Sequence, residues 1–142
     1  MAKIITREPH IVGQTKAVGF EIGVRKTFDV APEAAWTILT SEKGLRLWLG
    51  ELSRLPMEKG ESYQTADGTT GEIRATNPGG HIRLTWQPRG WRNPSTLQVR
   101  VIPSGVKTTI SFHQERLSGA EERERMRDHW KRVMAQLSEL FL

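Results

Sequence analysis

The sequence predicts an α+β fold in which a curved antiparallel sheet wraps around a long C-terminal helix, with two short helices after the first strand. Three observations support this prediction. Apolar residues alternate from Val18 to Val30, short strand-like runs with turn signals follow Gly60, and an apolar stripe at helical spacing ends the chain. A chain of 142 residues is long enough for one hydrophobic core and suggests no second one.

The first predicted strand has one buried face, because its apolar residues recur at every second position. These residues are Val18, Phe20, Ile22, Val24, Phe28 and Val30. Residues 1–16 show no periodicity, so we expect a partly ordered N-terminal arm there. A single domain is then expected over residues 17–142.

Two short helices are predicted next. Pro32 suits the first turn of a helix, and a second piece begins near Ser41 and ends at Gly50. Each is shorter than the roughly 12–15 residues at which an isolated helix becomes marginal in water. Tertiary packing must therefore hold both helices. We expect Trp36 and Trp48 to dock them at the open end of the curved sheet that wraps around the C-terminal helix.

The segment after Gly60 has the pattern of an antiparallel meander, with short runs and tight turns. The predicted strands cover residues 61–65, 69–76, 81–87, 95–102 and 106–114. Their inward positions are Ile73, Ala75, Ile82, Leu84, Trp86, Leu97, Val99, Val101, Val106, Ile110 and Phe112. Polar residues fill the opposite parity, which is typical of a sheet that is covered on one face.

The C-terminal helix has the clearest signals. Ser118 and Glu121 have the spacing of a capping box, and Glu122 adds negative charge near the helix N-terminus. The apolar stripe comprises Met126, Trp130, Val133, Met134, Leu137, Leu140 and Phe141. A helix of roughly 22 residues spans ~33 Å, enough to cross a small sheet.

Three segments together resemble a known family. They are VRKTFDVAPEAAWTILTSEKGLRLWLG, GGHIRLTWQP and TTISFHQERLSGAEERERMRDHWKRVMAQLSEL. In order and wording they resemble the helix-grip fold of the START and Bet v 1-like (SRPBCC) superfamily, over about residues 18 to 142. The branch that they resemble most is the C-terminal domain of the activator of Hsp90 ATPase.

The resemblance implies an apolar cavity between the sheet and the long helix, which in the superfamily holds lipids, sterols, polyketides or plant hormones. The residues expected to line it are Trp36, Leu39, Trp48, Tyr63, Trp86, Phe112, Met126, His129, Trp130, Met134 and Leu137. Two interpretations stay open: these side chains line a pocket for a small hydrophobic or amphipathic ligand, or they fill a solid core.

Polar groups near this region also allow two interpretations. His129 lies at the margin of the apolar stripe, where it is a ligand contact or a half-buried boundary residue. Glu122 could meet a polar ligand head, although capping alone explains it. Trp91 lies in a loop between Arg89 and Arg92, as a lid, a plain loop residue or an interface residue.

A basic surface is predicted on the outer face of the sheet. No acidic residue occurs from Ile73 to Gln114, and Arg74, Arg83, Arg100 and Lys107 have outward parity. Such a surface suits an anionic partner, such as a chaperone or another acidic protein surface, with nucleic acid disfavoured. Dispersed charges that only keep the protein soluble are the alternative. The branch resemblance implies the Hsp90-linked partner and a role in stress response.

No catalytic, metal or cofactor site is predicted. The chain has no cysteine, and its four histidines show no metal-ligand spacing. A cyclase-like enzyme therefore ranks third, behind ligand binding and a chaperone-linked module. The N-terminus lacks a signal-peptide pattern and no segment reaches membrane-span length, so we expect a cytoplasmic monomer or weak dimer.

Overall fold

The structure, a computed structural model, describes residues 14–15 and 19–142. Within them, seven antiparallel strands form one sheet in the order β1-β2-β7-β6-β5-β4-β3. The strands are β1 (Gln14–Thr15), β2 (Gly19–Phe28), β3 (Ser62–Gln64), β4 (Thr70–Asn77), β5 (His81–Trp86), β6 (Ser95–Ser104) and β7 (Lys107–Leu117).

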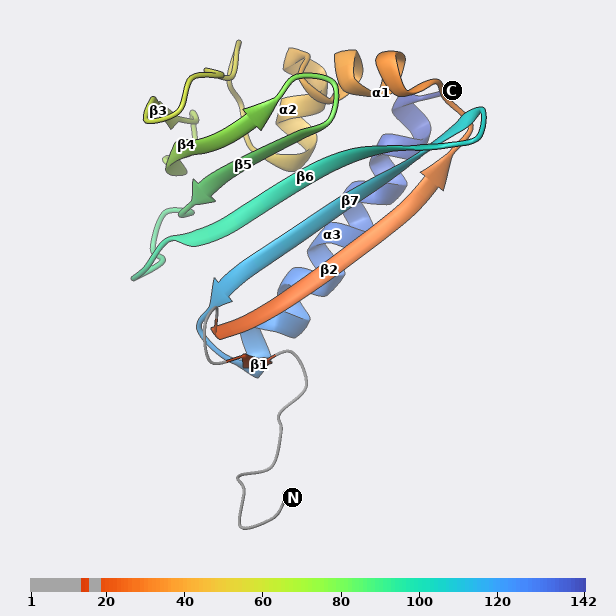
Figure 1. Cartoon of the computed structure of the whole chain (residues 1–142). Helices are drawn as coiled ribbons and strands as arrows, with labels where there is room; N and C mark the ends of the chain where they lie inside the picture. Colours follow the sequence, from red (N-terminus) through yellow and green to blue (C-terminus); the bar gives the residue numbers. More distant parts are fainter. Residues whose placement is uncertain (1–13, 16–18) are drawn as a thin grey trace, which may run out of the picture.

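The helix α3 (Ala120–Leu140) crosses one face of the curved sheet, which leaves the other face open to solvent (Figure 1). We call the uncovered side the outer face. The first long strand, β2, pairs with the last strand, β7, so segments from the two ends of the chain lie side by side in the sheet. This arrangement confirms the predicted fold class.

The predicted arm and the predicted first strand are only partly described. Residues 1–13 and 16–18, including Val18, lie outside the described residues. Gln14 and Thr15 form β1, which pairs with Phe20 and Gly19 at the start of β2. The division into an arm and a domain stays a prediction.

The short helices are α1 (Pro32–Leu39) and α2 (Glu42–Trp48), close to the predicted bounds. The hydroxyl of Ser41 accepts the backbone N–H of Gly44 at 3.1 Å and so caps α2. A Cβ added at Gly44 would collide with the carbonyl oxygen of Ile38. Glycine is therefore what allows α2 to fold back this closely on α1.

Trp48 docks these helices as predicted. Its ring is buried, and its indole Nε1 donates to the carbonyl oxygen of Leu39, the last residue of α1, at 2.9 Å. Trp36 is only half buried and packs at the edge of the core. Both tryptophans therefore contact the core, but Trp48 is the one that is fully buried.

Two predicted inward positions are wrong. A β-bulge in β4 places Ala75 opposite Arg83, on the outer face, and Thr76 opposite the buried Ile82. Val106 is 85% exposed, because it lies in the two-residue turn between the paired residues Ser104 and Lys107. An alternating pattern read straight through a bulge or a turn assigns the wrong face.

The predicted capping box at the start of α3 is also absent. The N-cap is Gly119, which has no side chain to accept a hydrogen bond. Glu122 instead accepts the backbone N–H of Ser118 at 3.0 Å. The carboxylate that stabilises the N-terminus of α3 is thus that of Glu122, one position after the predicted Glu121.

Among the helices of the described ranges, none is both long and apolar enough to cross a membrane.

Candidate functional site

The residues predicted to line a cavity gather between the sheet and α3. Trp36 and His129 are half buried, and the other nine are buried. Tyr63 stands apart on β3, where its hydroxyl donates to the carbonyl oxygen of Thr85 at 2.6 Å. Burial raises the pKa of Tyr63 far above its ordinary value, so the group is a neutral donor.

Six rings form a continuous group that we call the aromatic cluster: Trp48, Trp86, Trp91, Phe112, His129 and Trp130. At its centre Phe112 stacks on Trp130, with ring centroids 4.7 Å apart. The ring centroid of Trp86 lies 5.8 Å from that of Trp130, and the ring of Trp91 packs edge-on against Trp86 with centroids 5.5 Å apart. The cluster therefore runs from the deep core to the half-buried loop that holds Trp91.

A buried polar network holds the inner part of this cluster. Gln114, on the inward side of β7, accepts the indole N–H of Trp130 at 2.9 Å and donates to the hydroxyl of Ser95 at 2.9 Å. Ser95 donates in turn to the carbonyl oxygen of Trp86 at 2.7 Å. The donors and acceptors satisfy one another, as buried polar groups must.

His129 lies where the cluster approaches solvent. Its ring is 4.6 Å from Trp130 and 6.0 Å from Trp86, measured between centroids. Its Nε2 is buried and has no hydrogen-bond partner. Burial, with a smaller effect from the charge of Arg132, lowers the pKa of His129, so the imidazole is held neutral.

The four basic residues predicted on the outer face fall into two groups, those with an acidic partner and those without a recorded one. Arg74 pairs with Glu72 at 2.8 Å, and Arg83 pairs with Glu115 at 2.7 Å. Arg100 and Lys107 have no recorded ion pair with any residue that the structure describes. Glu115 follows directly after the acid-free stretch, so a neighbouring segment supplies part of the missing negative charge.

A groove of about 730 Å³ lies at one end of this face. It contains three arginines, Arg74, Arg83 and Arg116, together with the hydroxyl-bearing residues Thr85 and Thr96. Arg100 and Lys107 are not among its lining residues. The structure thus brings together two of the four predicted basic residues and adds Arg116, which the sequence analysis did not select.

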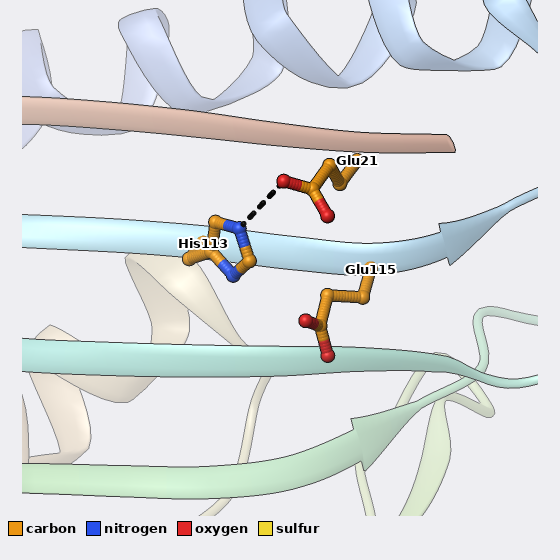
Figure 2. A group of neighbouring side chains, drawn as sticks. All are labelled: Glu21, His113 and Glu115. Atoms are coloured by element: carbon orange, nitrogen blue, oxygen red, sulfur yellow. Dashed lines mark ion pairs between the residues drawn. The ribbon is translucent and has the colours of Figure 1, made fainter. Parts of the chain in front are cut away.

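Beside the groove, three ionisable side chains point toward one another on β2 and β7 (Figure 2). His113 Nε2 lies 3.6 Å from Oε1 of Glu21, and one ligand atom from each of Glu21, His113 and Glu115 lies within 4.8 Å of the others. We call these residues the Glu-His-Glu cluster.

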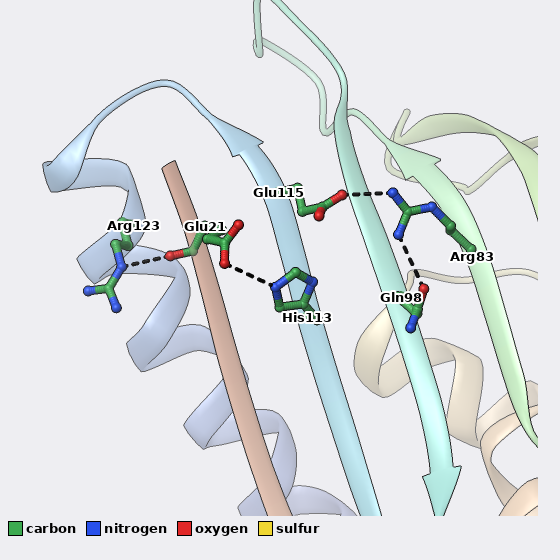
Figure 3. A network of polar contacts seen from close by, with 6 residues as sticks. All are labelled: Glu21, Arg83, Gln98, His113, Glu115 and Arg123. Atoms are coloured by element: carbon green, nitrogen blue, oxygen red, sulfur yellow. Dashed lines mark hydrogen bonds and ion pairs between the residues drawn. The ribbon is translucent and has the colours of Figure 1, made fainter. Parts of the chain in front are cut away.

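Further contacts hold the cluster in place (Figure 3). The guanidinium of Arg83 donates to Glu115 at 2.7 Å and to Gln98 at 3.2 Å. Arg123 on α3 donates from Nε to the backbone carbonyl of Glu21 at 2.7 Å. The cluster is therefore built on paired strands and anchored from both sides.

Comparison with known proteins decides the family. The family model described as "Activator of Hsp90 ATPase homolog 1-like protein" matches residues 29–141, most of the chain. The chain belongs to this family. Among curated proteins, the mouse activator of 90 kDa heat shock protein ATPase homolog 1 is 25% identical over 127 residues, which are 84% of this chain and 37% of that protein.

Solved structures of low sequence identity share the fold. CalU16 from Micromonospora echinospora superposes with a TM-score of 0.74 at 16% identity, covering 90% of this chain and 80% of that one. PFC0360w, an HSP90 activator from Plasmodium falciparum, gives 0.66 at 20% identity, covering 80% and 89%. The chain spans only about a third of the length of its curated relatives, so their whole activity does not transfer by similarity.

Sequence reasoning missed the Glu-His-Glu cluster and the Gln114 network. Glu21 and His113 are 92 positions apart in the chain, and only the register of β2 on β7 brings them together. One signal was present: Glu115 lies two positions after His113 and one beyond the predicted strand, so an extended strand would place both on one face. Gln114 could have been noticed as a polar residue on the inward parity beside Phe112.

Proposed function

We propose that this member of the Hsp90 ATPase activator homolog 1-like family binds a small apolar or amphipathic molecule at the end of the aromatic cluster formed by His129, Trp86 and Trp91. The observation that carries the proposal is the buried Nε2 of His129, which has no partner beside Trp86 and Trp130. A buried polar atom without a hydrogen bond costs about 1–3 kcal/mol, which a bound polar group would recover.

The chemistry around His129 suits such a ligand. Because its pKa is lowered, the ring stays neutral near pH 7 and can accept or donate one hydrogen bond without adding charge. The rings of Trp86 and Trp130 pack against the imidazole, so the surroundings of its nitrogen are apolar. An alkyl or ring system with one hydroxyl or carbonyl matches this combination.

Trp91 is the residue that would move to admit the ligand. It lies in the loop between β5 and β6, half buried, with its ring edge against Trp86. Its main chain is tied down by Gln87, whose Nε2 donates to the Trp91 carbonyl at 2.8 Å. Rotation of this one side chain would uncover Trp86 while the strands stay paired.

A dye-displacement titration tests the proposal. The neutral probe N-phenyl-1-naphthylamine should give saturable fluorescence with the wild-type protein, and 1-decanol should displace it. His129→Phe keeps an aromatic ring but removes the nitrogen, so decanol should bind about tenfold more weakly. The control His113→Ala, on the outer face, should bind decanol as the wild type does. Absence of saturable probe binding would sink the proposal, as would equal decanol affinity in His129→Phe.

A second candidate function is a chaperone-linked interaction through the outer face. Two observations favour it: the groove holds three arginines, and both curated relatives are named as activators of a heat shock protein ATPase. The anionic partner would be an acidic surface of an Hsp90 chaperone. Binding should then weaken on raising the salt from 50 to 150 mM, as surface electrostatics requires.

Charge reversal separates the two candidates. Arg100 is exposed and has no recorded ion pair within the described part of the chain. The substitution Arg100→Glu should therefore leave the fold intact. Chaperone capture should fall in Arg100→Glu and in Arg74→Glu, while decanol binding should persist. The interaction hypothesis is abandoned if both variants capture Hsp90 as the wild type does. The cyclase-like alternative gains no support, because Gln114 and Ser95 already satisfy each other.

A further inference from the structure

We propose that the Glu-His-Glu cluster on the outer face is a binding site for a divalent transition-metal ion, with Zn²⁺ as the best match. Its side chains are Glu21 from β2 and His113 and Glu115 from β7. This site is separate from the proposed ligand site, which lies on the opposite face of the sheet beside α3.

The register of the two strands explains why these side chains meet. Gly23 lies opposite His113 in the ladder, and Ile22 lies opposite Gln114. The register then shifts before Phe20 pairs with Leu117, so β7 carries an extra residue opposite Glu21. Arg116, at this bulge, has a left-handed φ of 65°. The bulge leaves Glu115 on the outer face beside Glu21 while Leu117 turns into the core.

The local charge balance favours a bound cation. Two carboxylates that face each other on neighbouring strands repel, and such pairs destabilise a sheet. Arg83 pairs with Oε1 of Glu115, and the Oε2 atom of Glu115 takes no part in this ion pair. Among the residues that the structure describes, the recorded partner of the Glu21 carboxylate is the imidazole of His113, at 3.6 Å. A divalent ion between the three groups would neutralise Glu21 and offset its repulsion from Glu115, which Arg83 already compensates in part.

The donor set selects the class of metal. One imidazole nitrogen with two carboxylate oxygens suits Zn²⁺ and related transition ions, whereas Mg²⁺ and Ca²⁺ prefer oxygen alone. In a tetrahedral zinc site with bonds near 2.1 Å, ligand atoms stand about 3.4 Å apart. The present atoms lie within 4.8 Å of one another, so small side-chain rotations would close the site. Three protein ligands leave a fourth position for water.

The surroundings support and expose the site. The side chains of His113, Glu21 and Glu115 are 35%, 32% and 14% exposed, which lets an ion enter from solvent while the ligands remain partly desolvated. Opposite His113, Gly23 offers no side chain that would cover the imidazole. Arg83 orients the Glu115 carboxylate, as hydrogen-bonded outer partners commonly do for metal ligands.

The test is metal titration of the tag-free protein of residues 1–142. Zn²⁺ is added in isothermal titration calorimetry, and Co²⁺ is added while its visible absorption is recorded as a report of coordination. We expect one ion per chain and a shift of the His113 ring signals in ¹H–¹³C NMR. The variants His113→Ala, Glu21→Gln and Glu115→Gln should each weaken Zn²⁺ binding by at least about tenfold.

His81→Ala is the matched control, because His81 also lies on the outer face, opposite Arg100, but is not part of the cluster. It should bind Zn²⁺ as the wild type does. Circular dichroism melting shows whether each variant is folded, and the isosteric Glu21→Gln keeps the test valid should His113→Ala fold poorly. No Zn²⁺ binding below 1 mM would overturn the proposal. So would equal binding by all three cluster variants, or loss of binding only in His81→Ala.

Discussion

The indole Nε1 of Trp130 donates a hydrogen bond to Oε1 of Gln114 at 2.9 Å, and both side chains are fully buried. This bond joins the centre of α3 to the inward side of β7. Because Gln114 also donates to Ser95, and Ser95 to the Trp86 carbonyl, one polar chain fixes two tryptophans of the aromatic cluster. The position of the cluster thus depends on a hydrogen-bond network as well as on apolar packing.

Gln114→Leu should therefore destabilise the protein, although leucine is apolar and of similar size. The substitution leaves the Trp130 N–H buried without an acceptor and removes a donor from Ser95. We expect a loss of about 1–3 kcal/mol in the free energy of unfolding, measured by urea denaturation. Gln98→Leu is the control: among the described residues its side chain is recorded in one hydrogen bond, from Arg83 on the outer face, so the loss should be smaller. A Gln114→Leu protein as stable as the wild type would contradict the network's role.

Gly44→Ala should also destabilise, against the usual preference of helices for alanine. Alanine normally favours a helix over glycine by about 1 kcal/mol. At this position the added Cβ would collide with the Ile38 carbonyl, and moving α2 away would loosen the docking of Trp48. We expect a net loss of about 1–3 kcal/mol in thermal or urea unfolding.

Gly119→Ala is the matched control for that change. A Cβ there meets no heavy atom within 4 Å, and the φ of 177° is extended backbone that alanine adopts. Alanine is a poorer N-cap than glycine, so a cost of at most about 1 kcal/mol is expected, smaller than that of Gly44→Ala. Equal effects of the two substitutions would argue against a close approach of α1 and α2.

The buried imidazole of His129 predicts a loss of stability in mild acid. Its pKa in the folded protein lies below the ordinary value of 6.5, so the unfolded chain binds a proton at a higher pH than the folded one. Above pH 6.5 the imidazole is unprotonated in both states, so His129 does not make stability depend on pH. Stability then falls as the pH drops from 6.5 toward the folded pKa. Urea unfolding from pH 7.5 to 5.0 should show the decrease, and His129→Phe should reduce its slope. An identical slope in the variant would place the titration elsewhere.

Much of the fold could be predicted from local patterns. The stripe of α3 marks the face that covers the sheet, since Met126, Trp130 and Leu137 are all buried there. The Ser41 cap and the stop near Gly50 gave α2 nearly its true bounds. Such features depend on contacts a few residues apart, which a single sequence displays directly.

The errors arose where one strand departs from regular pairing. Ala75 changes face at a bulge and Val106 leaves the sheet at a tight turn, and neither event alters the alternation of residue types. The same limit hid the Glu-His-Glu cluster, because Glu21 meets His113 and Glu115 only through the register of β2 on β7. Burial of the residues predicted to line a cavity could be predicted, whereas the unpartnered nitrogen of His129 depends on packing in three dimensions.

The most direct test of ligand binding at the aromatic cluster is an NMR titration of the indole N–H signals with 1-decanol. The five tryptophans give separate reporters. If the proposal is correct, the signals of Trp86 and Trp91 and the ring signals of His129 shift saturably, while Trp36 at the α1 edge stays unchanged. Unchanged signals from Trp86, Trp91 and His129 at saturating decanol would contradict the account.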